Sequence, residues 1–275
     1  MTVVAVSRQV GSYGDEIASL VAERLGFQVI GQTQVHELAE SCDPEFKDAC
    51  ALYEREVTKG FWERFFLNDP AYASLFESLN YQVAAKGDAV ILGRGAQIVL
   101  GGIPGVLRVR VVAPIKVRAE RLMKVQGGSF DDAFDFAQKH THQRRTLIQQ
   151  LYHKDLSDWS LYDLILNTEN MEPEGAAGIV QAAVKNMAAV ENPDAVRAEL
   201  KRRALAKLVE SAVRKKVSDA AYRVVEATCP EEGHVVLTGD VTELKSKEAA
   251  QAAAEKFAGV TKVENKIRVV EFKYF

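Results

Sequence analysis

Short apolar runs alternate with amphipathic segments along the first two-thirds of the chain. The segments between the runs carry apolar residues at helical spacing, as in Ile17, Val21 and Leu25. Strands that alternate with helices predict right-handed crossovers and a parallel sheet flanked by helices, an α/β fold. Five runs suit buried strands: Val3–Val6, Phe27–Ile30, Ala89–Leu92, Val106–Val112 and Leu164–Leu166.

Local signals place several helix ends. Residues 32–86 are expected to be mostly helical. Pro114 suits the first position of a helix, because its missing N–H would have no partner there. Gly127 and Gly128 should end that helix, and Ser129 should cap a long helix that follows, through about residue 150.

The pattern changes after a polar turn cluster at Glu191–Asp194, which is typical of a linker. The residues beyond it predict a compact α+β module of about 75 residues, a size that can fold alone. We therefore expect two domains, residues 1–190 and 196–275. The elements expected in the second are a basic helix, a strand, a turn, a strand, an alanine-rich helix and a final strand: Leu200–Lys215, Tyr222–Ala227, Pro230–Gly233, His234–Thr238, Ser246–Ala258 and Val263–Val269.

The composition is that of a globular protein, with 275 residues of which 47% are hydrophobic and 27% charged. A net charge of −3 argues against a general nucleic-acid binder. Three scattered cysteines predict reduced thiols rather than a disulfide framework. No signal segment and no apolar run of about 18 residues is visible, so a cytoplasmic protein without a membrane span is expected.

A glycine-punctuated turn, Ser7–Gly14, joins the first strand to the first helix. Such a turn directs backbone N–H groups and a helix N-terminus at one spot, which suits phosphate. The P-loop pattern G-x-x-x-x-G-K-[ST] adds a lysine for the phosphates and a hydroxyl for magnesium. Gly14 and Asp15 stand where these two residues would be expected. The turn predicts nucleotide binding but lacks the usual charge.

Four stretches of the first domain carry a family pattern: Ser7–Gly14, Leu92–Ala96, Val111–Pro114 followed by Arg118 and Arg121, and Leu161–Thr168. Through them the domain resembles the cytidylate kinase-like family of P-loop nucleoside monophosphate kinases over roughly residues 1–188. The resemblance implies a sheet flanked by helices, a helical region that closes over the acceptor nucleotide, and an arginine-bearing lid. It also implies ATP and Mg²⁺ as cofactors.

The resemblance also implies roles for individual residues. Arg94, in a Gly-Arg pair, would bind the acceptor phosphate, and Arg144 and Arg145 on the lid helix would reach the transferring phosphoryl group. Cytidylate kinases proper carry a lysine in the turn and an acid after Gly-Arg, where this chain has Gly14 and Gly95. The residues expected around the ATP phosphates are Ser7, Arg8, Gln9, Gly11, Ser12, Tyr13, Gly14 and Asp15.

The carboxylates of Asp15 and Glu16 leave two interpretations open. They stabilise a helix start by about 0.3–1 kcal/mol each, yet they repel an incoming triphosphate. Either Mg²⁺ bridges Asp15 to the phosphates, or the loop binds nucleotide poorly. The first interpretation predicts phosphoryl transfer from ATP to a nucleoside monophosphate, CMP or dCMP above others. The second predicts a nucleotide-sensing regulatory protein.

Two other groups have structural as well as functional interpretations. Arg118 and Arg121 lie three apart on one helix, so they suit a solvated face, pairing with Glu120, or catalysis. The aromatic residues within 61–66 suit either a core helix or the border of an acceptor-base pocket.

The C-terminal region carries a second signature: Gly233–Val241, followed by Gly259 and Val260 with Val263, Asn265 and Ile267. Through it this region resembles a BON module over about residues 198–271. Such modules are associated with binding lipids or small ligands. The expected partners are therefore nucleotides for the first domain and a lipid, small ligand or protein for the second. Nucleic acid is not expected as a partner, and the protein is not expected to be an integral membrane protein.

Overall fold

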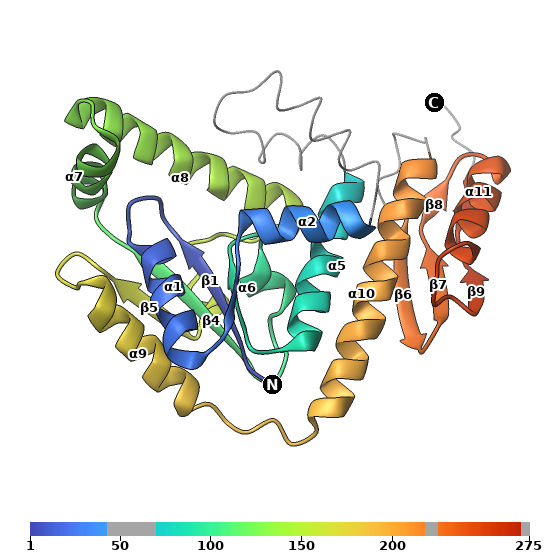
Figure 1. Ribbon diagram of the computed structural model, residues 1–275. Coiled ribbons are helices and arrows are strands. Elements are labelled where there is room, and N and C mark those ends of the chain that lie inside the picture. Colours follow the sequence, from blue (N-terminus) through green and yellow to red (C-terminus); the bar gives the residue numbers. More distant parts are fainter. Residues whose placement is uncertain (43–69, 218–224, 271–275) are drawn as a thin grey trace. The chain divides into compact units, whose positions relative to one another are not determined.

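A computed structural model describes residues 1–42, 70–217 and 225–270 (Figure 1). The chain forms two compact units. Unit 1 comprises Met1–Glu37 and Lys86–Pro193, and unit 2 comprises Leu38–Ala85 and Asp194–Phe275. A segment that precedes the third strand in sequence thus belongs with the C-terminal residues. The aromatic residues at 61–66 lie outside the described residues.

Unit 1 is built on a five-stranded parallel sheet with the strand order β2-β3-β1-β4-β5. The predicted apolar runs and the predicted α/β sheet are confirmed. β1 lies in the middle of the sheet, and its residues Val3–Val6 are at most 2% exposed. The strands are β1 Val3–Arg8, β2 Gln28–Ile30, β3 Ala89–Leu92, β4 Val106–Val112 and β5 Leu164–Asn167.

Helices flank this sheet, and two of them, α1 and α9, pack against each other and share one apolar core with it. The predicted cap at Ser129 is confirmed, because its Oγ accepts a hydrogen bond from the Asp132 N–H at 3.1 Å. Pro114 precedes its helix instead of beginning it, since its ψ of 144° is extended. The helices are α1 Gly14–Leu25, α6 Ala96–Val99, α7 Ile115–Gln126, α8 Phe130–Tyr152, the 3-10 helix η1 Trp159–Leu161, and α9 Pro173–Lys185. Helix α2, Gln32–Cys42, runs from unit 1 into unit 2.

In the residues that the structure describes, unit 2 combines helices with short strands around a core that includes Val209, Leu237 and Ile267. β7 pairs antiparallel with β6 and parallel with β9, and β8 pairs with β10. Ser78 Oγ of α5 donates to the Ala204 carbonyl of α10 at 2.7 Å. The elements are α5 Pro70–Lys86, α10 Pro193–Lys216, β6 Glu226–Glu231, β7 His234–Thr238, β8 Asp240–Val241, α11 Leu244–Glu255, β9 Lys262–Asn265 and β10 Arg268–Val269.

Two strand predictions in unit 2 need correction. The predicted final strand is two strands, β9 and β10, because the chain turns after Asn265, whose Oδ1 accepts the Ile267 N–H. β6 continues through Pro230, where a turn was predicted. Its pairing with β7 is irregular between Thr228 and Glu231, and a bulge in an edge strand tolerates proline. The expected strand start at residue 222 lies outside the described residues.

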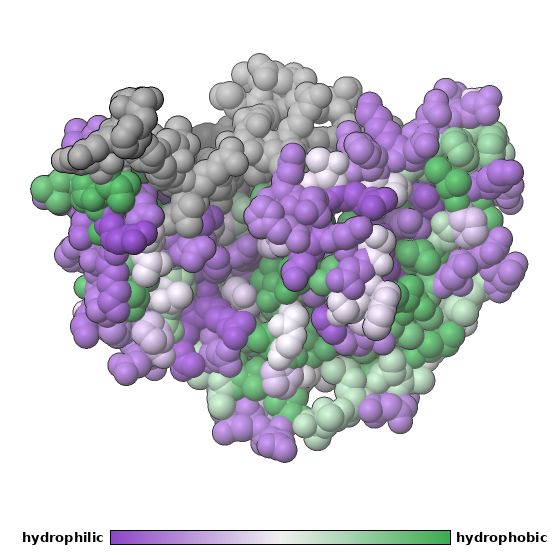
Figure 2. Space-filling model, turned by 180° about the vertical axis from the view of Figure 1, so that it is seen from behind, coloured by the Kyte–Doolittle hydropathy of each residue, from purple (hydrophilic) through white to green (hydrophobic). Residues whose placement is uncertain are grey.

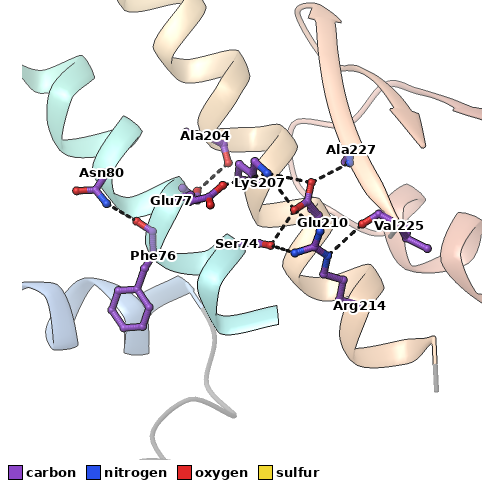
Figure 3. A network of polar contacts seen from close by, with 11 residues as sticks. Ser74, Phe76, Glu77, Asn80, Ala204, Lys207, Glu210, Arg214, Val225 and Ala227 are labelled. Carbon is purple, nitrogen blue, oxygen red and sulfur yellow. Dashed lines mark hydrogen bonds and ion pairs between the residues drawn. The ribbon is translucent and has the colours of Figure 1, made fainter. Parts of the chain in front are cut away.

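A buried carboxylate, Glu210 of α10, connects three elements of unit 2 (Figure 3). It is 1% exposed. Its oxygens accept hydrogen bonds from Ser74 Oγ of α5 at 2.8 Å and from the Ala227 N–H of β6 at 3.0 Å. Lys207 Nζ and Arg214 Nη2 each lie 3.0 Å from Oε1. The Glu210 side chain therefore links helix α5 to strand β6.

The large exposed apolar side chains of the described surface lie on different elements, as at Val125, Trp159 and Leu244. The face in Figure 2 mixes hydrophilic and hydrophobic residues. None of the helices in the described ranges combines the length and the apolar character that crossing a membrane requires.

Candidate active site

The turn between β1 and α1 is tight and is anchored to the end of β4. Ser12 is fully buried, and its Oγ donates to the Gln9 carbonyl at 2.7 Å. The same Oγ lies 3.2 Å from the Val111 carbonyl of β4. Gly11 has a φ of 75°, and a Cβ there would lie 2.7 Å from the Arg118 carbonyl oxygen. Only glycine fits at this position, because the backbone is left-handed and the Arg118 carbonyl leaves no room for a Cβ.

Two arginines of α7 contact the backbone of the turn. Arg118 is 3% exposed, and it donates to the carbonyls of Ala113 and Val10 at 3.0 and 3.3 Å. Arg121 donates to the Thr168 carbonyl, and its guanidinium carbon lies 3.8 Å from the centroid of the Tyr13 ring. The geometry therefore favours a structural role for both residues, with partners in and beside the turn rather than at Glu120.

Strained backbone gathers at this corner of unit 1. Tyr13 has a φ of 64° and Arg94 a φ of 58°, values in the left-handed region that non-glycine residues rarely adopt. Arg94 stands between Gly93 and Gly95, which have φ values of 73° and 70°. Such residues cost on the order of 1–3 kcal/mol each and cluster at functional sites. The Gly-Arg turn at the end of β3 is therefore a second feature of the candidate site.

The side chain of Arg8 extends across the turn. A Cβ on Gly14 would lie 2.6 Å from Arg8 Cγ, and a Cβ on Gly93 would lie 2.6 Å from Arg8 Nη1. Arg8 Nε and Nη2 lie 3.0 and 2.7 Å from Asp15 Oδ1. The Asp15 carboxylate, which we expected to repel phosphate, is thus balanced by a cation from the preceding strand.

The structure brings one of the two predicted lid arginines to the turn. Arg144 Nη1 donates to the Arg8 carbonyl at 2.9 Å. Arg145 is exposed, and its Nη2 lies 3.4 Å from Asp155 Oδ2. A small cavity of about 10 Å³, the space of one water molecule, lies between α8 and the turn. Its lining comprises Arg8, Gln9, Val10, Arg110, His140, Thr141, Arg144 and Leu156.

Arg110 of β4 is a candidate functional residue that we did not predict. It is 8% exposed, and its Nη1 donates to Ser7 Oγ at 2.6 Å. Burial lowers the pKa of the Arg110 guanidinium, although arginine stays protonated near neutral pH. Within the described part of the chain Arg110 forms no ion pair, whereas its neighbour Arg108 pairs with Asp163 at 2.6 Å. Two arginines inside the apolar run 106–112 were the signal that could have revealed it.

The match to a known family decides the identity of this fold. The sequence profile of the cytidylate kinase-like family matches residues 3–170. The chain belongs to this family. The profile of the BON domain matches residues 194–271. Both predicted resemblances are confirmed.

Individual relatives of the cytidylate kinase-like region carry the name cytidylate kinase. The protein of Pyrococcus horikoshii is 37% identical over 123 residues, 42% of this chain and 63% of that one. The protein of Pyrococcus furiosus is 28% identical over 186 residues, 67% of this chain and 89% of that one. The chain thus spans less than two-thirds of the P. horikoshii enzyme.

A solved structure supports the fold of the cytidylate kinase-like region. An uncharacterized protein from Eubacterium ventriosum superposes with a TM-score of 0.52 at 16% sequence identity. The match covers 67% of this chain and 98% of the other. At this identity the likeness concerns the fold alone.

Asp15 is the acidic side chain that the cytidylate kinase-like turn offers to a cation. It is 65% exposed at its side chain, and both contacts from Arg8 go to Oδ1. Mg²⁺ in nucleotide sites is usually held by one or two carboxylates together with phosphates and water, so this residue fits such a site. Across residues 1–42, 70–217 and 225–270, no group of three or more His, Cys, Asp or Glu could hold a metal ion by itself.

A second cavity, of about 410 Å³, lies in unit 2. Its charged groups are largely balanced, because Arg203 pairs with Glu199, and Lys207 pairs with Glu77 and Glu210. Burial raises the pKa of the Cys229 thiol, so it is a poor nucleophile. The lining comprises Tyr81, Glu199, Arg202, Arg203, Ala206, Lys207, Ala227, Thr228, Cys229 and Pro230.

Proposed function

We propose that the protein transfers the γ-phosphoryl group of ATP to a nucleoside monophosphate, CMP or dCMP above others. The observation that carries this proposal is the gathering of Arg8, Arg110 and Arg144 beside a glycine turn at the carboxyl end of a parallel sheet. Ligands of open α/β sheets bind at this end. Phosphoryl transfer requires positioning and charge neutralisation, which arginines supply. Family membership supports the same reaction class.

Each predicted residue has a role in this reaction. In the transfer, a phosphate oxygen of the acceptor forms a bond to the γ-phosphorus while the bond to the β–γ bridging oxygen breaks, so ADP leaves. Arg94 would bind the acceptor phosphate, and Arg144 and Arg145 would neutralise the transferring group. The residues proposed to bind ATP are Ser7, Arg8, Gln9, Gly11, Ser12, Tyr13, Gly14 and Asp15.

Asp15 would hold Mg²⁺ together with the phosphates, and the ion would neutralise charge on them when bound. The small volume beside Arg144 has a consequence for this proposal. Because the cavity equals about one water, a triphosphate enters only if the side chains of α8 move away from Arg8. Substrate binding and lid movement are therefore coupled.

A coupled assay tests the proposed activity. Full-length protein with ATP and Mg²⁺ is offered CMP, dCMP, UMP, AMP and GMP in turn, and ADP formation is recorded. We expect turnover that depends on the acceptor and is largest with CMP or dCMP. Arg94→Ala should raise the KM for the acceptor. An absence of turnover above background with every acceptor rejects the kinase proposal.

The second candidate is a nucleotide-sensing regulatory protein, which the glycine in place of the lysine at position 14 favours. Calorimetry with ATP and with CMP separates the two candidates, because binding without turnover supports sensing. No binding of any nucleotide rejects both. In either case the 410 Å³ cavity is the proposed place for a small ligand of the BON region. That the BON region binds lipid or a protein partner stays a prediction. The cytoplasmic location of the protein also stays a prediction.

A further inference from the structure

Compared with the P-loop pattern, the turn of this chain has a cation where the pattern has its first glycine, and a glycine where the pattern has its lysine. Counting G-x-x-x-x-G-K-[ST] back from Asp15 places the lysine at Gly14 and the first glycine at Arg8. The second glycine falls on Tyr13. A glycine has therefore replaced the cation, and a cation has replaced the glycine six residues earlier.

The structure explains why these two replacements belong together. A Cβ on Gly14 would lie 2.6 Å from Arg8 Cγ and closer still to Arg8 Cβ. Both distances are below any normal carbon–carbon contact, and the stem of a side chain so near its own backbone cannot move aside. Only one of the two positions can thus carry a side chain. The stem of Arg8 fills the space through which a lysine stem at position 14 would leave the helix.

The charged end of Arg8 lies between the two phosphate-related features of the site. Nη1 would lie 2.6 Å from a Cβ on Gly93, the residue that precedes Arg94. Nε and Nη2 contact Asp15 Oδ1 in the first turn of α1. The guanidinium therefore lies between the start of α1 and the Gly-Arg turn of β3, as a cation that bridges donor and acceptor phosphates must.

We propose that Arg8 replaces the P-loop lysine and binds the β- and γ-phosphates of ATP. This inference rests on the proposed function and adds the residue that carries the charge. Asp15 orients the guanidinium. Because the Asp15 side chain is 65% exposed, the ion pair is weak and phosphate oxygens can compete for the same donors. Arginine suits this role, since its planar fork matches phosphate in a bidentate manner.

Variants that restore the P-loop arrangement, with a glycine at position 8 and a lysine at position 14, test the proposal. Four full-length proteins are compared by calorimetry with Mg-ATP and by thermal melting: wild type, Arg8→Gly, Gly14→Lys and the double variant R8G/G14K. Arg8→Met is added because it keeps the packed stem on Gly14 and removes only the charge. Arg24→Ala is the matched control, because Arg24 lies in the last turn of α1, roughly 17 Å along the helix from the turn.

We expect Arg8→Gly and Arg8→Met to weaken Mg-ATP binding by about 10- to 100-fold, the contribution of a charge-assisted contact. Gly14→Lys alone should melt at a lower temperature than wild type, since its Cβ meets Arg8. R8G/G14K should melt near the wild-type temperature and recover most of the lost affinity. Arg24→Ala should bind Mg-ATP as wild type does.

Each contrary result has a distinct meaning. Wild-type affinity in a folded Arg8→Met variant, or no recovery in a folded R8G/G14K variant, overturns the role of Arg8 while leaving the kinase proposal intact. A Gly14→Lys variant that melts as wild type contradicts the exclusive packing of the two positions. An absence of Mg-ATP binding in wild type and in R8G/G14K alike rejects the proposed function and this inference with it.

Discussion

Replacing Glu210 by alanine should lower the free energy of unfolding of unit 2 by about 3–5 kcal/mol, the cost of breaking a buried ion pair. Glu210 is 1% exposed, so water cannot replace it at the Ala227 N–H without local opening of the core. The loss is large compared with the 5–15 kcal/mol typical of a whole domain. The variant should therefore lie close to its folding limit.

The magnitude follows from the groups that lose Glu210. The Ala227 N–H loses its carboxylate acceptor, and Arg214 loses its ion pair. A buried polar group left without an acceptor, such as the Ala227 N–H, costs about 1–3 kcal/mol. The rest of the expected range is the loss of the buried ion pair, although Arg214 keeps hydrogen bonds to the Val225 carbonyl and to Ser74 Oγ. Lys207 suffers less, because it also contacts Glu77 at 3.0 Å. Burial alone would lower the pKa of Lys207, but Glu77 and Glu210 together raise that pKa.

Scanning calorimetry of the full chain measures this loss, and hydrogen exchange at the Ala227 amide places it. We expect that amide to exchange faster in Glu210→Ala. The matched control is Glu199→Ala on the same helix, whose ion pair with Arg203 is exposed and should be worth less than about 1 kcal/mol. If the two variants lose equal stability, or if Ala227 stays as protected as in wild type, the reasoning is refuted.

Three further predictions concern unit 1. Arg110→Met should melt at or above the wild-type temperature and bind Mg-ATP more weakly, because a buried cation without a carboxylate partner costs stability; a markedly lower melting temperature in calorimetry would contradict this. Arg144→Ala should reduce kcat/KM more than Arg145→Ala in the coupled assay, since only Arg144 contacts the turn; equal losses would count against that assignment. Burial alone would raise the pKa of Asp163, but hydrogen bonds from Arg108 outweigh it and lower that pKa. The pair therefore stabilises the fold above the ordinary carboxyl pKa of about 3.9 and ceases to do so as pH falls through the lower folded value. Urea titrations of Asp163→Asn should lack this part of the acid dependence, and an unchanged acid profile would disprove it.

Periodicity predicted most of unit 1, because buried parallel strands are continuous apolar runs and the helices between them carry plain start and stop signals. The run 106–112 became β4 residue for residue. The prediction that a strand ends at Ala227 was wrong, because β6 continues to Glu231. Pro230 looks like a turn residue in sequence, but an edge strand with a bulge needs no N–H at that point.

The candidate site was predicted less completely than the sheet. The glycines marked the turn in the sequence, and the structure shows that Gly11 is required there by the close Arg118 carbonyl. The charge distribution could not be predicted from the sequence, because the pairing of Arg8 with Asp15 depends on how the Arg8 side chain crosses the turn. Arg110 was missed because the two arginines in the run 106–112 signal charge on that strand, but which of them is buried is known only once the neighbouring strands are placed.

The hydrogen bonds from α5 to α10 span 136 and 126 residues of sequence, at Ser74 and Ser78. During synthesis on the ribosome, the five strands of the parallel sheet have all emerged once residue 167 is out of the exit tunnel. Helix α5 is made before β3, but Glu210 and Ala204 of α10, to which Ser74 and Ser78 donate, are made after all five strands. We therefore expect the parallel sheet to be complete on the ribosome before α5 meets its partner helix.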